Sequence, residues 1–194
     1  IDALASAVAR YRHRAGQAPS AWHELVSAGI LPGIPVDNKI VCDNVGALDF
    51  DAVPKKLGVI GAGVIGLELG SVWNRLGSQV TILEGLPNFL AAADAEAAKV
   101  AAREFKKQGL DIRLGCKVSN TEVKKDGVHV SYTDDKGEQS IVVDKLLVAV
   151  GRRAATKGLL AEGTGVKLTD RGLVEVDAHC HTGLFGDGIG WDHA

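Results

Sequence analysis

Methionine is absent from the 194 residues, and cysteine is scarce. The chain begins at Ile1 rather than at an initiator methionine, so we expect a processed chain, a fragment or an artificial product. The three cysteines, Cys42, Cys116 and Cys180, lie far apart, so there is no CxxC pair for zinc or redox chemistry. An odd number of widely spaced thiols does not indicate a disulfide scaffold, and it favours reduced cysteines in a cytoplasmic protein.

Long apolar runs and a strong charge of either sign are also missing. No apolar stretch approaches the roughly 20 residues that cross a bilayer, and the start of the chain does not have the pattern of a secretory signal. The net charge is −2. We therefore expect neither a nucleic-acid partner nor a membrane partner. With 46% hydrophobic and 24% charged residues, the composition is that of an ordinary globular protein.

The first part of the chain predicts helices followed by an extended connection. In residues 1–30, apolar side chains recur at helical spacing, and Ser20 is a candidate N-cap for a second helix that Gly29 would end. Residues 31–56 open with Leu-Pro-Gly-Ile-Pro, which cannot be helical. We expect them to run extended as a lead-in to the domain that follows.

Strands and helices then alternate through residues 57–151. The pattern consists of an apolar strand, a helix, a β-branched strand, an Ala-rich helix that Asp94 caps and Gly109 ends, and a further strand, at residues 57–60, 64–76, 80–83, 94–108 and 112–114. Short links between such elements predict a parallel sheet with right-handed crossovers.

A different pattern follows residue 115. Short strands at 117–124, 128–133 and 139–143 are separated by turn sequences that end in Gly127 and Gly137, which predicts an antiparallel meander. A buried strand at residues 146–150 returns to the parallel sheet. The predicted fold class is α/β, a Rossmann-like parallel sheet with an inserted antiparallel β-meander, preceded by a short helical segment. Residues 152–194 form a Gly-rich tail with little periodicity.

Residues 61–66 read Gly-Ala-Gly-Val-Ile-Gly, a GxGxxG motif that follows a strand and opens a helix. Gly61 allows the tight turn, Gly63 lets a pyrophosphate approach the backbone, and Gly66 allows the helix to pack closely on the strand. Free N–H groups at the start of the helix, helped by the helix dipole, favour the phosphate charge. The motif in this context predicts a dinucleotide-binding turn.

Glu84 completes the motif at the end of the next strand, where a carboxylate can accept hydrogen bonds from the ribose hydroxyls of the adenosine. The same charge would repel the 2′-phosphate of NADP, and residues 85–90 contain no Arg or Lys to hold one. The sequence therefore favours NAD over NADP. FAD also carries an adenosine ribose, so a flavin-binding use of the turn stays open.

Residues 53–70, Val-Pro-Lys-Lys-Leu-Gly-Val-Ile-Gly-Ala-Gly-Val-Ile-Gly-Leu-Glu-Leu-Gly, closely resemble the NAD domain of the dihydrolipoamide dehydrogenase family. Residues 31–37, 43–48, 83–90 and 148–152 also resemble segments of that family. The Gly-rich tail, residues 152–194, resembles a truncated return to the family's FAD domain, whereas residues 1–30 do not resemble the family, and a foreign origin of that segment stays open. The resemblance implies an NAD(H)-binding domain of a flavoprotein that transfers hydride between FAD and NAD. It also implies that the partners are NAD(H) and either an FAD-binding half or a second copy in a family homodimer.

The resemblance also implies roles for individual positions. The pyrophosphate would be cradled by Gly61, Ala62, Gly63, Val64, Ile65 and Gly66, and the ribose would be bound by Glu84. Glu68 would lie near the nicotinamide and flavin, Val118 would flank the adenine, Gly151 would contact NAD, and Asp187 would contact the ribitol of FAD. The ordinary alternatives are an exposed helix carboxylate at Glu68 and plain strand residues at Val118 and Gly151.

Several family features are absent from these 194 residues. The sequence contains neither the family's FAD-binding βαβ unit nor its CxxxxC redox disulfide, and His193 cannot simply take the role of the family's His–Glu base. We therefore predict no catalytic residue beyond Glu68, and we expect the chain alone not to oxidise dihydrolipoamide. A non-catalytic binding or assembly module that keeps the same scaffold is the alternative.

His179-Cys180-His181 lacks a second ligand cluster, so we expect no metal site.

Overall fold

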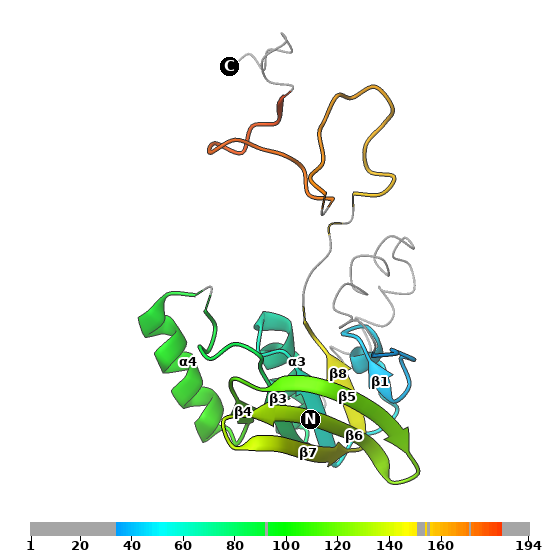
Figure 1. Ribbon diagram of the computed structural model, residues 1–194, viewed down its shortest axis with the longest axis vertical. Coiled ribbons are helices and arrows are strands. Elements are labelled where there is room, and N and C mark those ends of the chain that lie inside the picture. Colours follow the sequence, from blue (N-terminus) through cyan, green and yellow to red (C-terminus); the bar gives the residue numbers. More distant parts are fainter. Residues whose placement is uncertain (1–33, 92, 151–153, 155, 171, 184–194) are drawn as a thin grey trace.

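The computed structural model describes residues 34–91, 93–150, 154, 156–170 and 172–183 (Figure 1). Its elements are β1 (Val41–Cys42), η1 (Gly46–Leu48), β2 (Lys56–Ile60), α3 (Val64–Arg75), β3 (Gln79–Leu83), α4 (Ala95–Lys107), β4 (Asp111–Arg113), β5 (Lys117–Lys124), β6 (Gly127–Asp134), β7 (Gly137–Val143) and β8 (Lys145–Val148). The predicted helices of residues 1–30, Gly151 and Asp187 lie outside the described residues.

The parallel sheet has five strands in the order β1-β8-β2-β3-β4. β2 lies at its centre, paired in parallel with β3 on one side and with β8 on the other. The apolar, β-branched strands of residues 57–60, 80–83 and 146–148 therefore occupy the middle of the sheet, where both faces are covered. This confirms the predicted fold class.

The antiparallel sheet has three strands in the order β5-β6-β7 and lies beside the parallel sheet (Figure 1). Its tight turns use glycines in the left-handed region, Gly127 with φ of 136° and Gly137 with φ of 100°. Val128, Val130 and Tyr132 of β6 point inward and are buried. The alternation of buried and less buried side chains along β6 is typical of a sheet with one covered face.

Two clusters of buried side chains cover opposite faces of the parallel sheet. Alternate residues of β2 and β3, such as Val59 and Ile82, pack in one cluster with Leu67 and Trp73 of α3. The next residue along, such as Ile60, packs in the other cluster with the buried side chains of β6. The sheet is thus a middle layer between the helices and the meander.

The lead-in is more structured than the sequence predicts. Residues 34–56 were expected to run extended, but β1 pairs in parallel with β8, and Cys42, Ala47 and Phe50 are buried in the helix-side cluster. The parallel sheet therefore begins at Val41 rather than at Leu57. A strand of two residues has too few positions to show a period, so its pairing depends on the tertiary structure alone.

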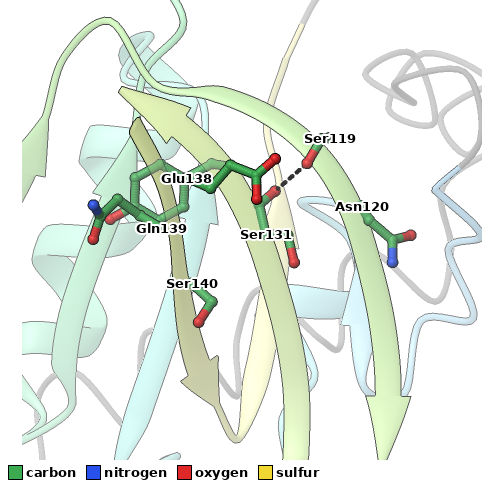
Figure 2. A pocket seen from close by; sticks show the side chains of 7 residues that line it. Ser119, Asn120, Ser131, Glu138, Gln139 and Ser140 are labelled. Atoms are coloured by element: carbon green, nitrogen blue, oxygen red, sulfur yellow. Dashed lines mark hydrogen bonds between the residues drawn. The ribbon is translucent and has the colours of Figure 1, made fainter. Parts of the chain in front are cut away.

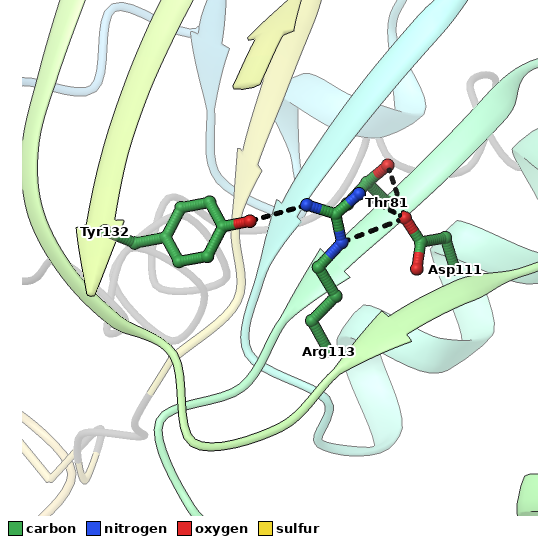
Figure 3. A network of polar contacts seen from close by, with 4 residues as sticks. All are labelled: Thr81, Asp111, Arg113 and Tyr132. Carbon is green, nitrogen blue, oxygen red and sulfur yellow. Dashed lines mark hydrogen bonds and ion pairs between the residues drawn. The ribbon is translucent and has the colours of Figure 1, made fainter. Parts of the chain in front are cut away.

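At the other end of the sheet, Arg113 connects the two sheets (Figure 3). Its Nη2 lies 2.7 Å from Asp111 Oδ2, and its Nη1 donates to the Tyr132 hydroxyl on β6. Because the guanidinium of Arg113 donates to Asp111, its pKa is raised above the ordinary value, and it stays charged at every physiological pH. β4 extends only to Arg113 rather than to Leu114, as its pairing with β3 ends there.

In the described part of the tail, Leu168 and Val174 form an isolated antiparallel bridge, and the Thr156 hydroxyl donates to the Gly172 carbonyl over 2.7 Å. None of the helices described here is both long enough and apolar enough to span a membrane.

Trp73 joins α3 to the lead-in, and its replacement tests how firmly that segment is held. Its indole Nε1 donates to the buried carbonyl of Ala47 over 3.0 Å, and its ring lies 5.0 Å from that of Phe50. Trp73→Phe removes the donor and leaves the Ala47 carbonyl unpaired. We expect a loss of about 1–3 kcal/mol in the free energy of unfolding, measured by urea denaturation. The exposed Lys99→Ala should change it by less than about 0.5 kcal/mol, and equal midpoints for the two variants would contradict the account.

Candidate functional site

A cleft of about 760 Å³ opens where β2 and β3 end. In open α/β sheets, ligands bind outside the carboxyl ends of the strands, and this volume lies in the range of small-molecule sites. The lining comes from the turn after β2, the segment after β3 and the residue after β8: Ala62, Gly63, Val64, Ile65, Glu84, Leu86, Asn88, Leu90, Ala91 and Ala149.

The turn after β2 requires glycine at two positions because the backbone is closely packed. Gly61 has φ of 102°, and a Cβ there would lie 2.7 Å from the Ala149 carbonyl oxygen. A Cβ at Gly66 would lie 2.0 Å from the Gly61 carbonyl oxygen. Gly61 and Gly66 therefore allow the close backbone packing behind the cleft lining, where no larger residue fits.

Gly63 differs from these two because it faces the open cleft. It is exposed, and a Cβ built on it would meet no atom within 4 Å. Its backbone is extended, with φ of −74° and ψ of 178°. The space in front of Gly63 is thus available to a molecule that approaches the backbone.

The start of α3 leaves its N–H groups without a side-chain acceptor. Gly63 is the N-cap and makes no side-chain capping bond, and the first turn contains no acidic residue. By contrast, α4 begins at Asp94, whose carboxylate accepts from the N–H groups of Glu96 and Ala97. The first N–H groups of an α-helix have no partner within the helix, so Val64 and Ile65 present unpaired donors to the cleft.

Glu84 lies at the rim of the cleft and connects two loops. Its Oε2 accepts from the Ala62 N–H over 2.7 Å, and its Oε1 accepts from the Leu86 N–H over 2.9 Å. Its backbone is held in turn by the strand that follows, because Glu84 N–H donates to the Arg113 carbonyl and Cys116 N–H donates to the Glu84 carbonyl, both over 2.8 Å. Both carboxylate oxygens are therefore fixed beside the glycine turn.

The structure brings together most of the predicted cofactor-binding residues that it describes. Ala62, Gly63, Val64, Ile65 and Glu84 line the cleft, and Gly61 and Gly66 support it. Glu68 is exposed on α3, and Val118 is half-buried on β5 against the meander-side cluster. Neither lines the cleft, so the roles of Glu68 and Val118 stay predictions. Gly151 and Asp187 lie outside the described residues.

Sequence reasoning gave no role to the outer wall of the cleft. Leu86, Asn88, Leu90, Ala91 and Ala149 line it. The first four belong to a segment without helical or strand periodicity, and Ala149 lies in the strand predicted at residues 146–150 but follows β8 in the structure. The available signal was their position directly after β3 and β8, at the edge where ligands of parallel sheets bind.

Another hollow, of about 630 Å³, lies on the meander (Figure 2). Its lining is hydroxyl and amide groups with a single carboxylate: Ser119, Asn120, Ser131, Tyr132, Glu138, Gln139 and Ser140. It presents neither a helix N-terminus nor a cation, so it does not suit a phosphate.

In the described part of the chain, no three His, Cys, Asp or Glu side chains are grouped to hold a metal ion.

The family model for pyridine nucleotide-disulphide oxidoreductases matches residues 27–187. The chain belongs to this family. It is 53% identical over 173 residues to dihydrolipoyl dehydrogenase of Cupriavidus necator, a match that covers 87% of this chain and 36% of that protein. It is 44% identical over 155 residues to the Thermus scotoductus enzyme of the same name, covering 78% of this chain and 33% of that one.

Solved structures agree with this family membership. The flavoprotein disulfide reductase RclA of Escherichia coli superimposes with a TM-score of 0.65 at 34% identity, over 80% of this chain and 35% of that one. LpdA of Mycobacterium tuberculosis gives 0.63 at 27% identity, over 76% and 32%. These comparisons confirm the dihydrolipoamide dehydrogenase-like resemblance. The chain spans about a third of the length of the curated relatives it matches.

Alanine at two of the motif glycines should affect stability very differently. Helix propensity alone would favour Gly66→Ala by about 1 kcal/mol, but its Cβ would meet the Gly61 carbonyl oxygen. We expect Gly66→Ala to lower the free energy of unfolding by about 3 kcal/mol or more. Gly63→Ala, with open space and an extended backbone, should change it by less than about 0.5 kcal/mol. Denaturant unfolding of both variants checks the pair, and equal losses would contradict the packing described here.

The cysteines should differ in reactivity, since Cys180 is exposed while Cys42 and Cys116 are buried. Burial raises the pKa of the Cys42 thiol to about 11 and also raises the pKa of Cys116, so neither supplies much thiolate at neutral pH. We expect Ellman's reagent to modify Cys180 alone in the native protein, and all three free thiols after unfolding. Cys180→Ser should abolish the native reaction. A native reaction that persists in Cys180→Ser would show that a buried thiol is accessible.

Proposed function

We propose that this chain is the NAD(H)-binding part of a dihydrolipoamide dehydrogenase-like flavoprotein oxidoreductase. The observation that carries the proposal is the start of α3, which opens onto the cleft without a capping side chain or an acidic residue. A helix that begins in this way, directly after a glycine turn, is suited to an anionic ligand. The family membership makes a pyridine dinucleotide the ligand of choice.

The residues of the cleft fit the pyrophosphate of such a dinucleotide. Val64 and Ile65 line the cleft at the start of α3, where no side chain caps the N–H groups, and the space at Gly63 is open. The partial positive charge of the helix N-terminus adds to these donors. Gly61 and Gly66 allow the close packing that gives the turn its shape.

Glu84 supports NAD(H) rather than NADP(H). Each carboxylate oxygen already accepts one backbone N–H and retains a further acceptor site, which suits the two ribose hydroxyls. A 2′-phosphate would place like charges side by side. The cleft lining contains neither lysine nor arginine to offset that repulsion.

When bound, the dinucleotide would supply a nicotinamide ring that accepts or donates hydride, and the family pairs it with FAD. The chain's own contribution in this proposal is to bind and orient the adenosine and pyrophosphate. The relatives' remaining two thirds correspond to no part of this chain, and we propose that an FAD-bearing segment or a second copy complements the site. The 194 residues contain no CxxxxC pair, and a second copy of them would add none, so in this proposal the redox disulfide for dihydrolipoamide oxidation comes with the FAD-bearing segment.

Calorimetric titration of the purified chain with NADH and NADPH tests the proposal. We expect NADH to bind at least about tenfold more tightly than NADPH. Glu84→Ala should weaken NADH binding by about tenfold or more, since a hydrogen bond to a charged group contributes roughly 1.5–3 kcal/mol. Glu84→Gln keeps the shape but removes the charge, so the gap between NADH and NADPH should narrow.

The exposed Glu122→Ala on β5 serves as the matched control and should bind NADH as the wild type does. Circular dichroism checks that each variant is folded. If the folded wild-type chain binds neither dinucleotide, the proposal fails and the glycine turn is scaffold, which would favour a non-catalytic binding or assembly module. A chain purified with flavin absorbance would instead assign the cleft to FAD.

A further inference from the structure

We propose that Asn88 recognises the adenine base of the dinucleotide and that Leu86 and Leu90 form the apolar walls of its subsite. This inference rests on the proposed NAD(H)-binding function and goes beyond it by naming the residues that select the base. It follows from where the ribose and phosphates must lie, how the segment after β3 is anchored, and which polar groups line the cleft.

The geometry of the cleft fixes the side on which the base must lie. One carboxylate oxygen of Glu84 accepts from Ala62 in the glycine turn and the other accepts from Leu86, which opens the segment from Leu86 to Ala91. In the proposed function the phosphates lie at the glycine turn and the ribose lies at Glu84. The base is attached to the far side of the ribose, so it reaches the segment 86–91. A contact of the base with Val118 remains compatible with this placement.

The apolar side chains of this segment suit the faces of a purine. Leu86 is 55% exposed although it is a large hydrophobic residue, and it lines the cleft. Leu90 and Ala91 line the same wall. An aromatic base placed against Leu86 would bury apolar surface that the unliganded chain leaves in water.

The segment is anchored on both sides of Asn88. The Leu86 N–H donates to Glu84 Oε1 over 2.9 Å, and the Leu86 carbonyl accepts from the Gly115 N–H over 3.0 Å. On the other side, the Phe89 ring lies 6.4 Å from that of Phe105 in α4, and Leu90 packs against the helix-side core cluster. A polar group held between two fixed points is positioned in advance for its ligand.

The backbone at Leu90 supports the same conclusion. Leu90 has φ of 47°, in the left-handed region that residues with bulky side chains rarely adopt. Its carbonyl accepts from the Ala93 N–H over 2.8 Å. Strain of this kind persists where the surrounding structure fixes it, and it is common at ligand sites.

Asn88 supplies the polar group that a base requires. Among the side chains that line the cleft, only Glu84 and Asn88 can form hydrogen bonds. Glu84 is bound to two backbone N–H groups, whereas the exposed Asn88 amide has no partner among the described residues. A carboxamide can accept from N6 and donate to N7 of adenine at the same time. Hypoxanthine carries an oxygen at position 6, which would face the Asn88 acceptor.

The test compares NADH with its hypoxanthine analogue, nicotinamide hypoxanthine dinucleotide in the reduced form, by calorimetric titration of the full chain. We expect the wild type to bind NADH about tenfold more tightly than the analogue, within the range that a bidentate base contact provides. Asn88→Ala should weaken NADH binding about tenfold, leave the binding of the analogue nearly unchanged, and so bring the ratio close to one. The ratio is the decisive quantity, because a general loss of affinity would lower both bindings equally.

Asn120→Ala is the matched control, since Asn120 is an exposed asparagine on the meander outside the cleft, and it should keep the wild-type ratio. If the wild type binds NADH and its analogue equally, or if Asn88→Ala keeps the wild-type ratio, the inference is wrong while the proposed function stands. If the wild type binds neither dinucleotide, the proposed function fails and the inference fails with it.

Discussion

The cleft depends on the two short hydrogen bonds that the Glu84 carboxylate accepts. They join the glycine turn after β2 to the segment after β3, at Ala62 and Leu86. Neither loop belongs to a helix or strand, and this carboxylate is the group that ties one loop to the other. Because a carboxylate offers about four acceptor sites, the same side chain can organise the cleft and still accept hydrogen bonds from a ligand. In the proposed function, Glu84 therefore serves both the structure of the cleft and the recognition of the ligand.

The position of Glu84 is itself a consequence of the order of strands in the sheet. β3 lies between β2 and β4, so its end is held by the glycine turn on one side and by Arg113 and Cys116 on the other. Arg113 continues this connection into the meander through Tyr132 (Figure 3). The surface ion pair of Arg113 with Asp111 adds little free energy by itself. Its contribution is to fix the edge of the parallel sheet against the layer that covers it.

The sequence predicted those parts of the fold in which a local pattern and the tertiary structure agree. The strand of Leu57, the helix that begins after Gly63 and the helix that Asp94 caps all appear close to their expected bounds, because periodicity, caps and glycines indicate the same element. The two residues of β1 carry no such pattern, and their strand exists only because β8 pairs with them. The glycine motif and Glu84 were predictable for the same reason, since each has a fixed place in one βαβ unit. Leu86 and Asn88 were not, because a loop wall is defined by which strands are neighbours rather than by a period.

The two described α-helices differ in how their N-termini are capped. α4 is stabilised at its N-terminus in the ordinary way, by the Asp94 cap and by Glu96 in its first turn. α3 has neither, although a capping side chain would typically contribute about 1 kcal/mol. Its sequence begins Gly-Val-Ile-Gly, which leaves donors unpaired and backbone open at the same place. A cap at Gly63 would stabilise the helix and would also occupy the volume and the N–H groups that an anion needs. In the proposed function the ligand supplies the acceptor that a capping side chain would otherwise provide at α3, and Gly61 and Gly66 shape the turn because a Cβ at either position would collide with a backbone carbonyl oxygen.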